Sequence, residues 1–290
     1  SNSGYVTTWK LGATWAPIED IRFRVTRSRD IRAPNLNELY QAGTANSDSV
    51  RNPAYTSDGL NGPASFGYSG LTTGNPNLEP EKADSWNIGA VLSPRFLPGF
   101  TASIGYFRID LQDAIDTISA QEIDNRCDEG IAQYCAAITN DPIRSTPTQP
   151  YLLIRSQPFN FARRLVRGID FDAAYRIPIG SGSFMVKGVA TRYIENLADT
   201  GIAGVVPVNT VGANGGQYST PTWIFRGSAT YETPTFSATV VGRGISAGKY
   251  SASGIECTSG CPVSTSQFPT YDNNRVSGLF YADFNVTQKV

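Results

Sequence analysis

The chain carries residue types that do chemistry in other proteins, but few of them are spaced for catalysis. It contains no histidine, so a serine–histidine–aspartate triad, a cysteine–histidine pair and a histidine metal site cannot be built from it. Asp170 and Asp172 resemble an acid and base pair, but two residues apart on a strand they are neighbours on one face. We therefore predict no catalytic site, no metal site and no cofactor, and interpret both aspartates as charges on a hydrated face.

Two arginines alternate with apolar residues in the stretch that begins at Ile21. Ile21, Phe23 and Val25 share one parity and Arg22 and Arg24 the other, which predicts a strand. Burying unpaired guanidinium groups costs too much for a dry core, so the second face must be wet or heavily paired. The two arginines either contact another part of the protein, such as a loop, or line a path for an anionic ligand, which the guanidinium fork suits.

The four cysteines form two local pairs, Cys127 with Cys135 and Cys257 with Cys261. A disulfide in each pair suits an oxidising compartment. An uninterrupted helix would hold Cys127 and Cys135 about 12 Å apart, beyond disulfide reach, so Gly130 is predicted to break it. Four free thiols, or one metal site built from all four cysteines, are the alternatives, although zinc sites usually show a tighter paired spacing.

Alternation of apolar and polar residues predicts nine strands that position these groups. They are 5–15, a strand that begins at 21, and 84–92, 100–111, 165–177, 184–193, 222–231, 235–243 and 280–286. Short turns at 16–20, 93–99, 178–182 and 232–234 alternate with long loops at 30–82, 112–163, 195–219 and 247–276. Outer-membrane barrels show this asymmetry, with short periplasmic turns and long extracellular loops. The predicted fold class is therefore all-β, an antiparallel transmembrane β-barrel.

The predicted strands have one apolar and one charged face. The apolar face carries Trp15, Trp86 and Trp223 and is predicted to face lipid, with Arg167 as a charged exception. The charged face is predicted to face the lumen, and its members are Lys10, Arg22, Arg24, Asp170, Asp172, Arg176, Arg226, Arg243 and Asp283.

Composition agrees with this interpretation. The formal net charge is −1, from 24 basic and 25 acidic residues, so nothing steers the whole chain toward nucleic acid. Charged residues make up only 17%, and 28 glycines with 14 tyrosines and 14 phenylalanines fit strands and turns better than helices. One of the most apolar stretches, 201–208, is far shorter than the ~20 residues of a membrane helix. Barrel strands need only ~9 to 11 residues.

Two motifs resemble those of a known family. The first comprises Arg32, Ala33, Pro34, Asn35, Leu36, Glu38, Leu39 and Tyr40, and the second Asn75, Pro76, Asn77, Leu78, Glu79, Pro80, Glu81 and Lys82 with Trp86, Asn87, Ile88 and Gly89. In this order and at this separation they resemble the barrel of a TonB-dependent outer-membrane receptor. Arg167-Gly168-Ile169-Asp170 and Tyr281-Ala282-Asp283-Phe284-Asn285 resemble two further strands of that family, so the resemblance spans nearly the whole chain.

The resemblance implies about nine strands of a 22-stranded barrel that encloses a plug. Residues 1–290 would then be the C-terminal portion of the barrel domain, without the plug, about eleven early strands and the last two. It also implies energised uptake of a scarce nutrient such as a siderophore, cobalamin, haem or a saccharide, bound by extracellular loops. The expected partners are outer-membrane lipid and, through the missing N-terminal part, the TonB complex, and the expected location is the outer membrane of a Gram-negative bacterium.

Two other classes of protein share parts of the pattern. A passive porin or an autotransporter-like barrel would show the same alternation, and a secreted β-sandwich adhesin with disulfide-bonded loops would share the composition. A plug domain and TonB box in the full gene would decide against the first class. A single tilted sheet with its aromatic residues outward would decide against the second. An enzyme is the least favoured class.

Overall fold

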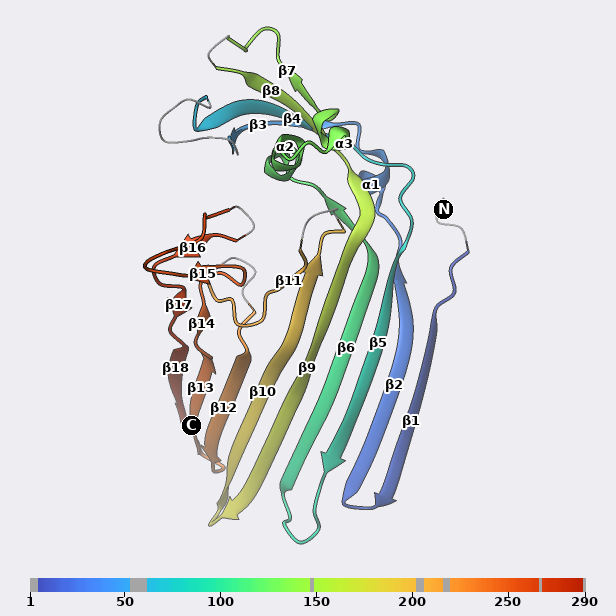
Figure 1. Cartoon of the computed structure of the whole chain (residues 1–290). Helices are drawn as coiled ribbons and strands as arrows, with labels where there is room; N and C mark the ends of the chain where they lie inside the picture. Colours follow the sequence, from blue (N-terminus) through green and yellow to red (C-terminus); the bar gives the residue numbers. More distant parts are fainter. Residues whose placement is uncertain are drawn as a thin grey trace. The chain divides into compact units, whose positions relative to one another are not determined.

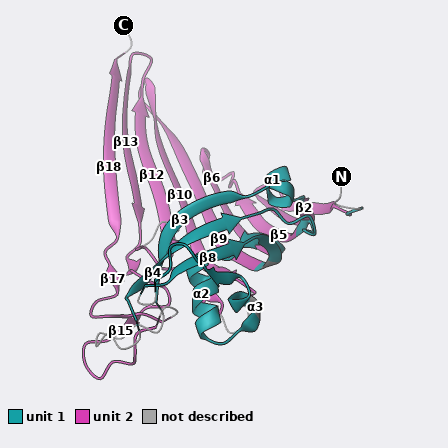
Figure 2. Ribbon diagram, turned by 90° about the horizontal axis from the view of Figure 1, so that it is seen from above, with its two compact units in different colours: residues 1–6, 32–81, 113–162 teal, residues 7–31, 82–112, 163–290 magenta. Residues whose placement is uncertain are grey.

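The computed structural model describes residues 5–52, 62–146, 149–201, 206–215, 220–265 and 268–288. These residues divide into two compact units, coloured separately in Figure 2. Unit 1 comprises Ser1–Val6, Arg32–Glu81 and Asp113–Ala162, and unit 2 comprises Thr7–Ile31, Lys82–Gln112 and Arg163–Val290. No helix among the described residues is long and apolar enough to cross a membrane.

Unit 2 is built on one sheet of long strands, which lie side by side in Figure 1. In spatial order they are β1 (Trp9–Ile18), β2 (Ile21–Arg32), β5 (Glu81–Leu92), β6 (Phe100–Thr117), β9 (Pro158–Ile179), β10 (Gly182–Asp199), β12 (Trp223–Glu232), β13 (Phe236–Ile245) and β18 (Leu279–Gln288). Spatial order follows chain order, and the nine predicted strands each correspond to one of these nine.

Short strands lie in the connections of unit 2. β11 (Val208–Asn209) pairs with β10, β14 (Gly248–Lys249) pairs with β17 (Arg275–Val276), and β15 (Ile255–Glu256) pairs with β16 (Thr270–Tyr271). The turns between β1 and β2, between β9 and β10 and between β12 and β13 are each a few residues long. The predicted alternation of short and long connections is therefore present in the sheet.

Unit 1 holds structure that the sequence interpretation assigned to irregular loops. β3 (Thr44–Arg51), β4 (Ser65–Thr72), β8 (Tyr151–Ser156) and β7 (Ile138–Asn140) form a four-stranded sheet in that order. Three short helices belong to the same unit: α1 (Leu36–Tyr40), α2 (Ala120–Asp128) and α3 (Ala132–Cys135). Val50 and Ile154, which are 1% and 2% exposed, anchor its core. The loop interpretation of 30–82 and 112–163 was wrong for these elements.

The long strands also extend further than predicted toward the long connections. β6 ends at Thr117, β9 begins at Pro158 and β10 ends at Asp199. Apolar and polar residues are mixed on each face of these extensions, so they carry no clear alternation, and the backbone ladder maintains them instead. For example, Asp199 lies opposite Arg163 in the β9–β10 ladder.

Candidate functional site

The two motifs, about forty residues apart in sequence, meet through one ion-pair cluster in unit 1. Arg32 at the end of β2 donates from Nε and Nη2 to the two carboxylate oxygens of Glu81, each at 2.7 Å. Its Nη1 donates to both oxygens of Glu38 at 3.0 Å. Glu81 is buried and also accepts from the backbone N–H of Ile115 at 2.8 Å. We call Arg32, Glu38 and Glu81 the motif cluster.

Helix α1 carries the first motif into this cluster. Asn35 is its N-cap: the Asn35 side chain accepts from the Glu38 N–H at 2.9 Å, and the Glu38 side chain accepts from the Asn35 N–H at 2.7 Å. This reciprocal pair is a capping box. Pro34 precedes the cap, where its missing N–H costs no helical hydrogen bond. Leu39 is buried, whereas Tyr40 is exposed.

The second motif packs against the same helix. Asn75 is buried, accepts at its backbone oxygen from Leu78 and donates from its side chain to the Pro158 carbonyl at 2.9 Å. Its backbone N–H donates to the Glu38 carbonyl at 2.8 Å. Before it, Gly74 approaches the backbone of α1 so closely that a Cβ would lie 2.6 Å from the Tyr40 nitrogen. Pro76, Leu78 and Pro80 complete the segment, with Leu78 buried. These motif residues therefore hold the loop base together.

In unit 2 the register places the apolar residues of the predicted strands on one face of the sheet and the lumen-facing candidates on the other. Phe171 lies opposite Ala190, which lies opposite Phe225 in the next strand. Trp15 lies opposite Phe23, and their rings stack with centroids 5.7 Å apart. The same face continues from β2 to β5, where Arg27 lies over the Trp86 ring, and from β6 to β9, where Phe100 contacts Tyr175. We keep the names apolar face and charged face for these two surfaces.

All six lumen-facing candidates lie at charged-face positions of the register. Arg24 lies opposite Thr14, Asp170 opposite Thr191, Asp172 opposite Val189, Arg176 opposite Met185, and Arg226 opposite Val189 and Arg243; Arg22 shares the parity of Arg24. Asp170 accepts from the Thr191 hydroxyl at 2.6 Å, and Arg176 donates to the Ser183 hydroxyl at 3.1 Å. These contacts are those of a hydrated polar surface.

An arginine belt crosses the apolar face, and the sequence interpretation noticed only one of its members. The belt consists of Arg27, Arg29, Arg108, Arg163, Arg167 and Arg192, which lie where the strands approach the long connections. Asp110 accepts two bonds from Arg163 and one from Arg108, at 2.8 to 2.9 Å. Arg29 pairs with Asp84, and Arg167 with Glu195, both at 2.7 Å. One signal in the sequence could have revealed the belt: the alternation of β2 continues past Phe23, so Arg27 and Arg29 fall on the apolar face.

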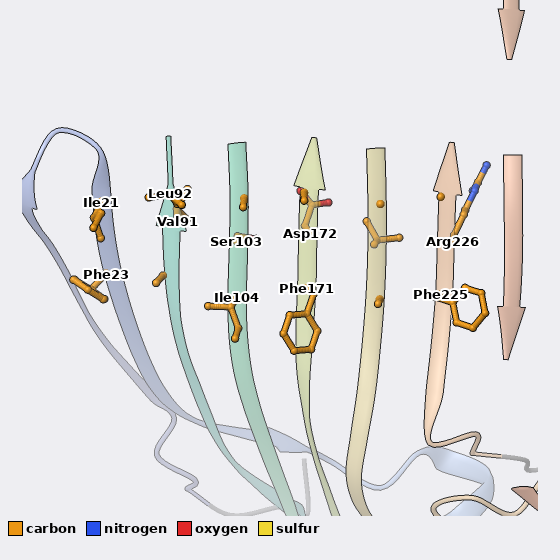
Figure 3. Close-up of a pocket in the computed structure, with 17 residues that line it drawn as sticks. Ile21, Phe23, Val91, Leu92, Ser103, Ile104, Phe171, Asp172, Phe225 and Arg226 are labelled. Carbon is orange, nitrogen blue, oxygen red and sulfur yellow. The ribbon is translucent and has the colours of Figure 1, made fainter. Parts of the chain in front are cut away.

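A groove of about 760 Å³ opens on the apolar face (Figure 3). Small residues form its floor, including Ala90, Ala173 and Gly188, and phenylalanine rings rise beside them. A Cβ added at Gly188 would meet no atom within 4 Å. The groove exists because large and small side chains alternate across neighbouring strands of this face.

Both predicted disulfides are present. Cys127 is bonded to Cys135, with Cα atoms 4.6 Å apart, and Cys257 to Cys261, with Cα atoms 5.6 Å apart. Gly130 separates α2 from α3 with φ of +85°, as the helix-break argument requires. The free-thiol and four-cysteine metal alternatives are therefore wrong. No group of three or more potential metal ligands occurs within the described ranges.

Removing the first disulfide should loosen the helical segment alone. For a loop of this length, chain entropy predicts a loss of about 2–3 kcal/mol in the Cys127→Ser, Cys135→Ser variant. We expect faster proteolysis between α2 and α3, with the long-strand sheet unchanged by circular dichroism. The Cys257→Ser, Cys261→Ser variant is the matched control, since its bond lies in unit 2. Equal rates of proteolysis between α2 and α3 in the two variants would contradict this expectation.

Asp124 in α2 makes unit 1 sensitive to pH. Its side chain is buried and its Oδ2 has no hydrogen-bond partner within the described structure. Burial, with a smaller contribution from Asp128, raises the pKa of Asp124 to about 6. Because the folded pKa exceeds that of the unfolded chain, ionisation destabilises the fold, and the cost grows as pH rises from about 4 to 6.

The Asp124→Asn variant should remove this cost at neutral pH. A shift of this size corresponds to a gain on the order of 2–3 kcal/mol above pH 6 and none below pH 4. The measurement is amide hydrogen exchange of Ala120–Asp128 at several pH values, corrected for intrinsic rates. Asp128→Asn should give a much smaller gain. A stability of α2 in the parent protein that does not change between pH 4 and pH 7 would exclude the effect.

Comparisons with known proteins agree with this geometry. The family model described as "TonB dependent receptor-like, beta-barrel" matches residues 1–290. The fold is similar to a mutant of the ferric enterobactin receptor PfeA from Pseudomonas aeruginosa in complex with enterobactin (TM-score 0.59, 16% identity, 98% of this chain and 33% of that one). It is also similar to the siderophore receptor PirA from Acinetobacter baumannii (TM-score 0.57, 14% identity, 99% and 35%). The chain thus spans about a third of the length of these receptors.

Proposed function

The chain belongs to the TonB-dependent receptor β-barrel family, and from that premise we propose that it forms part of the wall of an outer-membrane channel for energised nutrient uptake. In this proposal residues 1–290 are the C-terminal portion of the barrel domain. The plug, about eleven earlier strands and the last two strands belong to the rest of the protein. The chain contributes transport and binding surfaces rather than catalysis.

The division of the sheet into an apolar and a charged face carries this proposal. A strand that spans a bilayer needs lipid-compatible side chains on one side only, and a water-filled lumen accepts the other side. On the apolar face of unit 2, the side chains of Val240, Phe280 and Phe284 are 47%, 66% and 71% exposed. So large an unpartnered apolar surface on a soluble protein would favour aggregation. The family match also sets aside the β-sandwich adhesin.

The proposed ligand is a small, scarce nutrient such as a siderophore, cobalamin, haem or a saccharide. The long connections would bind it, and the charged face, including Arg22, Arg24, Asp170, Asp172, Arg176 and Arg226, would line its path or contact the plug. One solved protein with this fold is described as a siderophore receptor and another as a ferric enterobactin receptor, which favours iron-loaded siderophores as the first class to test. The energy would come from the TonB complex through the N-terminal part of the receptor.

Uptake by cells tests the proposal. Deleting the gene should abolish accumulation of the cognate iron-loaded siderophore, and the full-length gene should restore it. Deletion of tonB should give the same loss as deletion of the receptor gene, because uptake against a gradient needs that energy. Accumulation that persists in the tonB strain but still requires the receptor would contradict active transport and favour a passive porin.

A further inference from the structure

Two arginines of the belt are held by tryptophan rings rather than by carboxylates. The Arg27 guanidinium lies 5.5 Å from the Trp9 ring centroid and 4.8 Å from that of Trp86. The Arg192 guanidinium lies 5.7 Å from the Trp223 centroid. Both arginines are exposed, and neither forms an ion pair with a carboxylate in the described parts of the chain. Their charges are therefore oriented by the rings without being neutralised.

The charge of the whole belt remains positive. Its six arginines share the face with four carboxylates, Asp84, Asp110, Glu195 and Asp199. Arg27 and Arg192, which no ion pair neutralises in the described structure, lie near the two ends of the belt. At its centre a single carboxylate, Asp110, is shared by Arg108 and Arg163. An anion that approached this face would meet several guanidinium groups at once.

The belt lies next to the apolar groove along the same strands. On β2, Arg27 is four residues from Phe23, and on β9, Arg167 is four residues from Phe171. Four residues of strand span about 13 Å. Figure 3 shows Phe23, Ile104, Phe171 and Phe225 distributed along the groove. An amphiphile of ordinary length could therefore place its headgroup on the belt and its chains in the groove.

We propose that the arginine belt binds the phosphorylated headgroup of a lipid in the outer leaflet, whose acyl chains lie along the groove. The inference rests on the proposed function, which puts this face against lipid and the long connections outside the cell. Arginine suits the partner because its planar fork binds phosphate oxygens through two donors. The tryptophans belong at the same depth, since their amphipathic rings favour the membrane interface. A soluble anion would use the arginines but would leave the groove empty.

The test uses the purified full-length receptor and native mass spectrometry, with bisphosphorylated lipid A as the probe. The parent protein should retain lipid A and should lose it when the phosphates are removed from the probe. Arg27→Gln with Arg192→Gln should weaken retention by about tenfold for each arginine. Gly188→Phe, which fills the groove at a position with free space, should also weaken retention.

The control variant, Arg24→Gln with Arg226→Gln, removes the same charge from the charged face of β2 and β12. It should retain lipid A like the parent. Resistance of the folded barrel to unfolding in detergent establishes that each variant is folded. Equal retention in all variants, equal loss in the control, or a second copy of the receptor in place of lipid would overturn the proposal. Uptake is measured separately: lipid retention without uptake would overturn only the proposed function, and uptake without retention only this inference.

Discussion

Arg32→Ala is expected to destabilise the receptor by about 2–3 kcal/mol, since it removes the two charge-assisted hydrogen bonds that the buried Glu81 carboxylate accepts from Arg32. Glu38 would lose the same partner, although it is more exposed and keeps its place in the capping box. The base of the loops should open first, because the motif cluster joins the end of β2 to α1 and the start of β5. The measurement is the denaturant midpoint of the receptor in lipid vesicles.

Arg95→Ala is the matched control for this expectation. Arg95 also pairs with two carboxylates, Glu19 and Asp20, at 2.8 and 2.9 Å. However, its side chain is 69% exposed, so the loss should be about 0–1 kcal/mol. If both variants changed stability by the same small amount, the motif cluster would have no special role in holding the loops.

Val240→Arg should prevent stable insertion of the barrel or cost about 2–4 kcal/mol, because it puts a charge on the lipid face near the middle of β13. Val240 lies opposite Ala229 and Phe284 on the apolar face. No acidic residue faces it from either neighbouring strand. The readout is the fraction of receptor that resists unfolding after extraction from the outer membrane.

The neighbouring residue supplies a control of identical chemistry. Val241 points to the charged face, where it lies opposite Ser228 and Asp283. Val241→Arg should change stability by less than about 1 kcal/mol, since the new cation would be hydrated and close to Asp283. A larger loss from Val241→Arg than from Val240→Arg would mean that the two faces have been assigned the wrong way round.

The sequence predicted the long-strand sheet well because most of its strands alternate apolar and polar side chains between their two faces. In β9, for instance, Phe171, Ala173 and Tyr175 share a face and Asp172 takes the other, which gives a clear period of two. Gly130 and the cysteine spacing likewise predicted the helix break and its disulfide. These features depend on local geometry, which a single sequence contains.

The parts that were missed depend on partners distant in sequence. β3 is polar and has no apolar alternation, and it is a strand because β4 pairs with it from Arg51 to Thr44. β4 and β8 pair in parallel although about eighty residues separate them. The arginine belt was missed for a related reason, since Arg108 and Arg163 become neighbours only through Asp110.

The central claim is that alternate residues of one strand face lipid and water. Ala173 and Ala174 are adjacent, chemically identical positions of β9 that lie opposite Gly188 and Lys187. A spin label attached through Ala173→Cys or Ala174→Cys, in receptor reconstituted into vesicles, reports which phase each position meets. We predict that oxygen dissolved in the lipid relaxes the label at 173, and that a water-soluble nickel complex relaxes the label at 174. Equal access of the nickel complex to both labels, or the reverse order, would contradict the account.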